Sequence, residues 1–216
     1  MHYKQFNSMK RLLILVLIIT FFQFSVNSQQ NNVRTALLII DIQNFYFPGD
    51  DGPGLVNPEA ASLKAKEILE IFRENKELVV HVQHLARKRS DIEIHKNVKP
   101  ILDEKVITKK EINSFLGTDL LEYLNAKSIN RLVIIGMQTQ LCVEGATRAA
   151  HDFGFECIVV EDACATRDLK FEDKLIKAED VHYSVLATLK SGGYARIIDL
   201  ENFKENIDKY VYQSFE

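Results

Sequence analysis

Six short apolar runs recur along this 216-residue chain, and the segments between them carry apolar side chains at helical spacing. The runs are Ala36–Ile40, Leu78–Val82, Lys105–Thr108, Arg131–Ile135, Cys157–Val160 and Ala195–Ile198. Helices are predicted over Pro58–Arg73, Thr118–Lys127, Cys142–Phe153 and Phe171–Leu189. Strands that alternate with helices predict an α/β domain of three layers, Rossmann-like, with a mostly parallel sheet and helices on both faces.

The first 28 residues have the pattern of a secretory signal peptide. Lys10 and Arg11 precede an apolar run that extends from Leu12 to Phe24. This run is shorter than the ~20 residues that a membrane-spanning helix needs, and an uncleaved anchor is the alternative interpretation. Cleavage near Ser28 predicts a secreted or periplasmic protein with no stable membrane anchor and one domain over residues 29–216.

Composition excludes several classes of function. The net charge of −3 provides no general attraction to nucleic acid, and the basic segment Arg87–Arg89 is expected to be a solvated loop. The chain has no P-loop or G-x-G-x-x-G pattern, which argues against nucleotide binding. Its three cysteines are too few for a disulfide scaffold. Cys157 and Cys164 flank an extended run that keeps them apart, so both are expected to be buried and unreactive.

Cys142 is the candidate nucleophile. It follows the fourth apolar run after a short polar turn, in a pattern typical of strand, tight turn and helix. In the first turn of a helix, the helix dipole and free N–H groups lower the pKa of a thiol below its usual ~8.5. The alternative is a buried structural cysteine, which is a common environment for this residue.

Polar side chains also follow the first three predicted strands. These residues are Asp41, Gln43, His84, Lys109 and Lys110. Ligands of open parallel sheets bind beyond the carboxyl ends of the strands. We therefore expect an acid, a base and the Cys142 thiol on one rim of the sheet, although Asp41 by itself fits a turn cap equally well.

Three separated motifs resemble the isochorismatase-like cysteine hydrolases, which include nicotinamidases, N-carbamoylsarcosine amidohydrolases, ureidoacrylate amidohydrolases and isochorismatases. The motifs are Leu38–Asn44, Val106–Leu120 and Gly136–Ala150, and they occur in the family's order. The resemblance implies the same α/β fold, a small-molecule substrate and no cofactor. It also implies a homo-oligomer, either a dimer or a tetramer.

The family's catalytic triad of Asp, Lys and Cys maps onto Asp41, Lys109 and Cys142. In these roles Asp41 accepts the thiol proton and later delivers it to the leaving amine, and Lys109 favours both ionised groups. Lys110 is the rival assignment, because only one of two adjacent strand residues faces the site. The spacing to Phe115 favours Lys109.

The resemblance further implies an unusual cis peptide at Gln138–Thr139 and an oxyanion hole formed by the backbone N–H groups of Gln138 and Cys142. The residues expected to bind substrate are Gln43, Tyr46, His84 and Phe115. For His84 the alternative is a polar residue that ends a strand. For the two aromatic residues the alternative is an ordinary core position.

Nicotinamidases of this family hold a metal with an Asp-x-His element, where this chain reads Gln83-His84-Leu85-Ala86. His81 and His84 are expected on opposite faces of a strand, so no metal site is predicted. True isochorismatases hydrolyse a vinyl ether and lack the nucleophilic cysteine. Cys142 therefore favours hydrolysis of an amide, ureido or carbamoyl C–N bond. An ether hydrolase and a catalytically silent binding module on the same fold are the alternatives.

Overall fold

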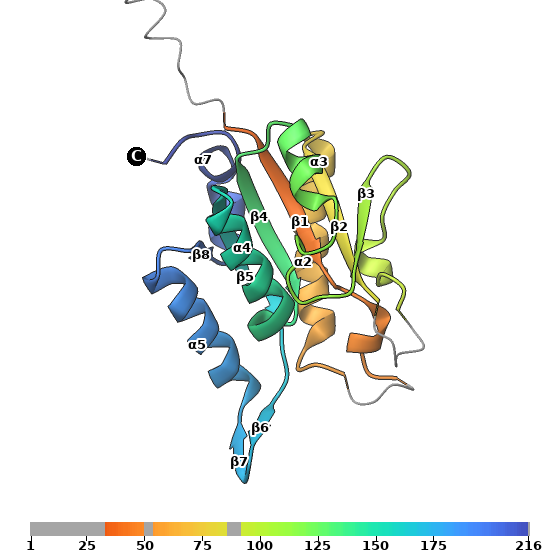
Figure 1. The fold of residues 1–216 in the computed structure, drawn as a ribbon, viewed down its shortest axis with the longest axis vertical. Helices are drawn as coiled ribbons and strands as arrows, with labels where there is room; N and C mark the ends of the chain where they lie inside the picture. Colours follow the sequence, from red (N-terminus) through yellow and green to blue (C-terminus); the bar gives the residue numbers. More distant parts are fainter. Residues whose placement is uncertain (1–32, 50–53, 86–91, 216) are drawn as a thin grey trace, which may run out of the picture. The chain divides into compact units, whose positions relative to one another are not determined.

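Six parallel strands form the central sheet of the computed structural model, which describes residues 33–49, 54–85 and 92–215 (Figure 1). The strands are β1 (Thr35–Ile40), β2 (Leu78–His84), β3 (Lys105–Lys109), β4 (Arg131–Met137), β5 (Glu156–Ala165) and β8 (Arg196–Ile198). Their order is β3-β2-β1-β4-β5-β8, and each neighbouring pair is parallel. Every apolar run that predicts a strand overlaps one of them, because strands buried on both faces have continuous apolar sequences.

Helices cover both faces of the sheet (Figure 1). The helices on one face are α2 (Pro58–Glu74), α6 (Leu200–Glu205) and α7 (Ile207–Val211). Those on the other face are α3 (Leu120–Ala126), α4 (Glu144–Asp152) and α5 (Ala178–Ser191). Side chains of β1 alternate between the two cores, with Ile39 in the first and Ile40 in the second. The predicted three-layer α/β fold is confirmed.

The helix predicted over Phe171–Leu189 is wrong in its first part. Two short antiparallel strands, β6 (Leu169–Phe171) and β7 (Lys174–Ile176), form a hairpin there, and α5 begins only at Ala178. The Asp168 carboxylate explains this boundary, because it accepts a hydrogen bond from the Ala178 N–H at 2.8 Å. Leu175, expected on the buried face of the helix, is 58% exposed.

The other helix boundaries agree closely with the sequence. Pro58 is the first residue of α2, as predicted, although the Asn57 side chain before it makes no capping hydrogen bond. The helix predicted from Cys142 begins at Glu144, because a π-helical turn, η3 (Thr139–Val143), precedes it. Single 3-10 turns, η1 (Asn44–Tyr46) and η2 (Lys96–Val98), interrupt the segments that follow β1 and β2.

Cys157 and Cys164 lie in β5 and are both free and buried, as predicted. Burial raises the pKa of each thiol to about 12. Both thiols are therefore protonated at neutral pH, and the two cysteines are poor nucleophiles.

Two predictions fall on segments that the structure does not describe. The predicted signal peptide, residues 1–28, and the basic segment Arg87–Arg89 both lie outside the described residues. Across residues 33–49, 54–85 and 92–215, no helix has the length and apolar character to cross a membrane.

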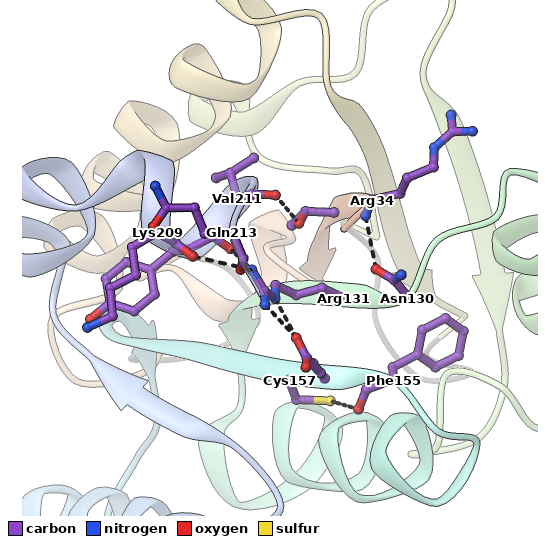
Figure 2. Close-up of polar contacts among 11 residues, drawn as sticks. Arg34, Asn130, Arg131, Phe155, Cys157, Lys209, Val211 and Gln213 are labelled. Carbon is purple, nitrogen blue, oxygen red and sulfur yellow. Dashed lines mark hydrogen bonds and ion pairs between the residues drawn. The ribbon is translucent and has the colours of Figure 1, made fainter. Parts of the chain in front are cut away.

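Arg131 stabilises the sheet at the amino-terminal ends of its strands, opposite to their carboxyl ends. Its guanidinium donates hydrogen bonds to the carbonyl oxygens of Tyr210 and Gln213 at 3.1 and 2.8 Å (Figure 2). The same group pairs with Glu156 and lies 3.8 Å from the ring centroid of Phe215. These partners compensate the desolvation of a fully buried cation. Arg131 therefore anchors the C-terminal segment to the sheet, far from the rim where the candidate residues lie.

Candidate active site

The ammonium group of Lys109 is the centre of the candidate site. Its Nζ lies 2.8 Å from Oδ2 of Asp41, 3.1 Å from Nδ1 of His84 and 3.1 Å from Sγ of Cys142. It also donates to the carbonyl oxygen of Glu111 at 3.0 Å. The acid, base and thiol that the sequence predicts on one rim are thus in contact through a single cation.

Strand register explains why Lys109 and His84 meet. The two residues are direct partners across the parallel pair β2–β3. Alternation places Lys109 on the same face as the buried Ile107, and it turns Lys110 outward, where Lys110 is exposed. The structure therefore places Lys109, and not its neighbour, among the site residues.

Asp41 reaches the site because the chain leaves β1 in a left-handed conformation, with φ of +50° at Asp41. Strict alternation after Ile40 would send the next side chain to the opposite face. Gly136, next to Ile40 on β4, makes this exit possible. A Cβ on Gly136 would lie 2.0 Å from the carbonyl oxygen of Ile40, and its φ is +140°. Glycine is therefore required where β4 passes the end of β1.

Cys142 lies in the π-helical turn η3 between β4 and α4, and it is only 4% exposed. The cis peptide predicted at Gln138–Thr139 is wrong by one position, because the cis bond joins Met137 to Gln138. The reason is that β4 extends to Met137, beyond the predicted strand end at Ile135, so the bond directly follows the strand. The oxyanion hole at the N–H groups of Gln138 and Cys142 stays a prediction.

The prediction of a lowered Cys142 pKa is contradicted. Burial, together with the negative charge of Asp41, raises the pKa of the thiol to about 12, and the Lys109 ammonium opposes this shift. Burial also raises the pKa of Asp41 above 3.8, and the Lys109 ammonium opposes that shift. The resting Cys142 is therefore a thiol and not a thiolate.

His84 and Tyr46, two predicted substrate residues, lie beside these groups. Burial and the Lys109 ammonium lower the pKa of His84, so the neutral imidazole accepts the lysine hydrogen bond through Nδ1. Burial and the negative charge of Asp41 raise the pKa of Tyr46, whose hydroxyl contacts the Gln138 side chain. Both residues therefore border the reacting groups, and their roles in substrate binding stay predictions.

Gln43 has a different role from the predicted one. It is fully buried, and its amide nitrogen donates to the carbonyl oxygens of His84 and Ile92. Its amide oxygen accepts a hydrogen bond from the His84 N–H at 2.8 Å. Because these contacts occupy its amide, Gln43 holds the end of β2 in place and does not face a substrate.

Phe115 is also not a pocket residue. The segment that contains it runs along α4, where Ile112 lies so close to Gly145 that a Cβ there would approach it to 2.9 Å. The Phe115 ring packs on Phe153 and Phe155, with centroids 5.4 and 6.2 Å away. These partners follow the C-terminal end of α4, whereas Cys142 precedes its N-terminal end, so Phe115 is a core residue.

Sequence reasoning missed the side chains that hold the turn before Cys142. Thr139 Oγ1 lies 2.9 Å from Nδ1 of His182 on α5, and Thr166 Oγ1 donates to Gln140. His182 comes 43 residues after Thr139 in a segment of ordinary helical pattern. Only a histidine on an otherwise apolar helix face could have indicated it, and that signal alone is weak.

Three potential metal ligands occur together in the site. An oxygen of Asp41, a nitrogen of His84 and the sulfur of Cys142 lie within 4.8 Å of one another. The Lys109 ammonium contacts all three groups and supplies the positive charge beside the Asp41 carboxylate that a metal ion would otherwise supply. The donor set therefore fits an internal cation supplied by the protein itself.

The chain is similar to proteins of one family. The profile of the isochorismatase domain matches residues 35–190. The uncharacterised isochorismatase family protein YddQ of Bacillus subtilis (strain 168) is 42% identical over 180 residues, which are 79% of this chain and 99% of YddQ. Ureidoacrylate amidohydrolase RutB of Variovorax paradoxus (strain S110) is 29% identical over 134 residues, 60% of this chain and 50% of RutB. A crystal structure from Oleispira antarctica, described as an isochorismatase hydrolase, has a TM-score of 0.75 at 38% identity and covers 83% of this chain and 99% of its own.

Proposed function

The chain belongs to the isochorismatase family of hydrolases, and on that premise we propose that it is a cysteine hydrolase that cleaves a C–N bond of a small molecule. The observation that supports this proposal is the contact of Lys109 Nζ with both Asp41 Oδ2, at 2.8 Å, and Cys142 Sγ, at 3.1 Å. A nucleophile, a proton acceptor and a cation in mutual contact are the groups that acyl transfer requires.

In the first half of the reaction, the Cys142 proton passes to Asp41 as Sγ bonds to the carbonyl carbon of the substrate. The carbonyl oxygen becomes an oxyanion, and the N–H groups of the η3 turn are proposed to stabilise it. The tetrahedral intermediate collapses when the C–N bond breaks. The proton held by Asp41 goes to the departing nitrogen, and a thioester remains on Cys142.

In the second half, water attacks the thioester carbon while Asp41 takes one of its protons. The C–S bond then breaks, and the proton returns from Asp41 to the Cys142 sulfur. The products are an acid and an amine or ammonia. The raised pKa of Asp41 suits this shuttle, because a carboxylate with a higher pKa is a stronger base and still a competent acid.

We propose an amide, a ureido compound or a carbamoyl compound as the substrate. A thiol nucleophile suits these groups because acyl transfer to sulfur releases an amine and stores the acyl group as a thioester. A vinyl ether offers no acyl carbon for this step. The name of the similar amidohydrolase RutB supports the same class of bond.

The test is to incubate the full chain with primary amides, N-carbamoyl compounds, ureides and an enol ether. Ammonia or amine release is measured, and rapidly quenched samples are analysed by intact-protein mass spectrometry and peptide mapping. We expect turnover of at least one C–N compound and an acyl adduct on Cys142. The Cys142→Ala variant is expected to lose both, and Cys157→Ala, which removes another buried thiol, should keep both.

Two results would contradict the proposal. Consumption of the enol ether alone, without an adduct, would identify an ether hydrolase. Binding of panel compounds without any reaction would identify a catalytically silent module.

A further inference from the structure

Side chains from outside the turn contact Thr139 and Gln140, which lie between the cis peptide and Cys142. Thr139 is fully buried and contacts Nδ1 of His182 at 2.9 Å. Gln140 accepts a hydrogen bond from Thr166, and its amide nitrogen donates to Gln138 at 3.0 Å. The turn itself supplies no side-chain cap. The two outside partners come from the residue that follows β5, Thr166, and from α5.

His182 is the partner that α5 contributes. This helix follows the β6–β7 hairpin and packs against η3, and its buried residues include Val181 and Leu186 on either side of His182. Thr139 is the first residue of the turn, and Cys142 is the fourth. A displacement of Thr139 therefore moves the backbone that carries the thiol.

We propose that His182 is a positioning residue, which acts through Thr139 to hold the η3 turn, and with it Cys142, in the geometry for attack. This inference rests on the proposed cysteine chemistry. Among the described residues, His182 makes no hydrogen bond or ion pair with Asp41, Lys109 or Cys142, and its polar partner is Thr139. Burial lowers the pKa of His182, so a neutral ring makes one hydrogen bond to the Thr139 hydroxyl whichever partner donates.

A second feature of His182 makes a direct substrate contact the alternative to be tested. The residue also lines a cavity of about 360 Å³ between α2, the end of β5 and the start of α5. Lys64, Asp162, Glu179 and Tyr183 supply the polar part of this wall. A residue that binds substrate changes KM, whereas one that positions the nucleophile changes kcat.

The test compares matched variants of both partners. His182→Ala removes the contact, and His182→Asn keeps an amide near the position of Nδ1. Thr139→Val removes the hydroxyl without changing the shape, and Thr139→Ser keeps it. The double variant Thr139→Val with His182→Ala completes a cycle that measures the coupling of the two side chains.

Steady-state kinetics on the best compound of the panel gives the first readout. We expect His182→Ala and Thr139→Val each to lower kcat about tenfold with KM within about twofold, since one hydrogen bond is worth about that factor. The double variant should lose no more than either single variant. His182→Asn and Thr139→Ser should recover most of the rate.

Alkylation by iodoacetamide, followed residue by residue by mass spectrometry, is independent of turnover. Cys142 is 4% exposed, so a loosened turn should expose the thiol and raise its labelling rate severalfold in His182→Ala and Thr139→Val. Cys157 is the internal control, because it is buried and does not line the cavity that His182 lines. It should stay unlabelled in every variant that keeps its fold.

The histidine nitrogen signals in ¹⁵N NMR give a third readout. The His182 Nδ1 signal should shift in Thr139→Val and not in Thr139→Ser. Additive losses in the double variant, a change in KM alone, or lower thermal stability with unchanged kcat and labelling would each overturn the proposal. If the wild type hydrolyses no compound, the proposed function fails, but the labelling and NMR results still decide the role of His182.

Discussion

The Lys109 ammonium lies 2.8 Å from Oδ2 of Asp41, and solvent reaches neither side chain. A buried ion pair adds little to the free energy of unfolding compared with apolar residues of similar size. The loss of one partner, however, leaves an uncompensated buried charge, which is strongly destabilising. The pair therefore links the stability of the domain to the geometry of its candidate nucleophile, because the same ammonium also contacts the Cys142 sulfur.

Replacement of this cation should destabilise the fold in a pH-dependent way. We expect Lys109→Met to lower the free energy of unfolding by about 3–5 kcal/mol at neutral pH. Without Lys109 the Asp41 pKa rises further in the folded state, so stability falls as pH increases above the unfolded value of ~3.9. Urea unfolding at pH 5 and pH 8 measures both effects. The exposed neighbour provides the control, because Lys110→Met should change stability by no more than about 0.5 kcal/mol.

Asp41→Asn should separate two effects of the carboxylate, which are its action as a proton acceptor and the influence of its charge on the pKa of Cys142. Turnover should fall by about 10²–10⁴-fold, because the proton shuttle is lost. The reaction of Cys142 with iodoacetamide at pH 7 should accelerate, since the variant removes a charge that raises the thiol pKa and leaves Lys109 in place. Parallel measurements of turnover and labelling test this opposite response. Unchanged turnover would contradict the assignment of Asp41 as the base, and slower labelling would contradict the effect of its charge on the thiol pKa.

On the acidic side of the pH profile, kcat/KM should begin to fall at a pH above the ordinary pKa range of an aspartate. Burial raises the Asp41 pKa above 3.8, against the opposing effect of Lys109, and the ionised carboxylate is the form that accepts the thiol proton. Activity should therefore decline at a higher pH than an exposed aspartate would cause. The wild-type pH profile, with circular dichroism to verify folding at each pH, measures this decline. Constant activity down to pH 4 would be incompatible with this role.

Gly136→Ala should prevent the approach of β4 to the end of β1. The new Cβ would lie 2.0 Å from the Ile40 carbonyl oxygen, and backbone atoms cannot yield as a flexible side chain can. We expect a loss above about 4 kcal/mol, or no soluble protein. Gly154→Ala is the matched control, because its φ is +91° but no atom lies within 4 Å of the new Cβ. It should lose only about 1–2 kcal/mol.

We propose that the chain is exported and that the segment before the domain is removed. The basic residues Lys10 and Arg11 and the apolar run after them support this proposal. The N-terminal sequence of protein recovered after expression with an export pathway should begin near Gln29. A Lys10→Glu and Arg11→Glu double variant should reduce export. Recovery of a chain that begins at Met1 would show that the segment is retained.

Much of the fold and the core of the site could be predicted because their signals are local. Strands buried on both faces must be apolar, so β1 and β4 are visible in the sequence. Asp41 and Lys109 follow or end such strands, and the carboxyl ends of parallel strands meet at one edge. Alternation along β3 allows only one of Lys109 and Lys110 to turn inward, and the structure shows that it is Lys109.

Other features depend on contacts between distant segments. Gln43 has a polar side chain of the kind that binds substrates, but its amide makes hydrogen bonds to the backbone of His84 and Ile92. Phe115 belongs to the motif that contains the candidate lysine, yet its ring packs on Phe153. No local pattern encodes the contact of His182 with Thr139, because the two residues meet only after α5 packs on the η3 turn.

The sequence by itself determined the α/β fold, the positions of the strands and the candidate thiol, acid and lysine, because periodicity and residue type are written along the chain. Only the tertiary structure decided how these groups affect one another. Burial beside Asp41 raises the pKa of the Cys142 thiol to about 12, where position at a helix start predicted a lower value. Desolvation and the distance between charges depend on packing, which no single segment of the chain specifies.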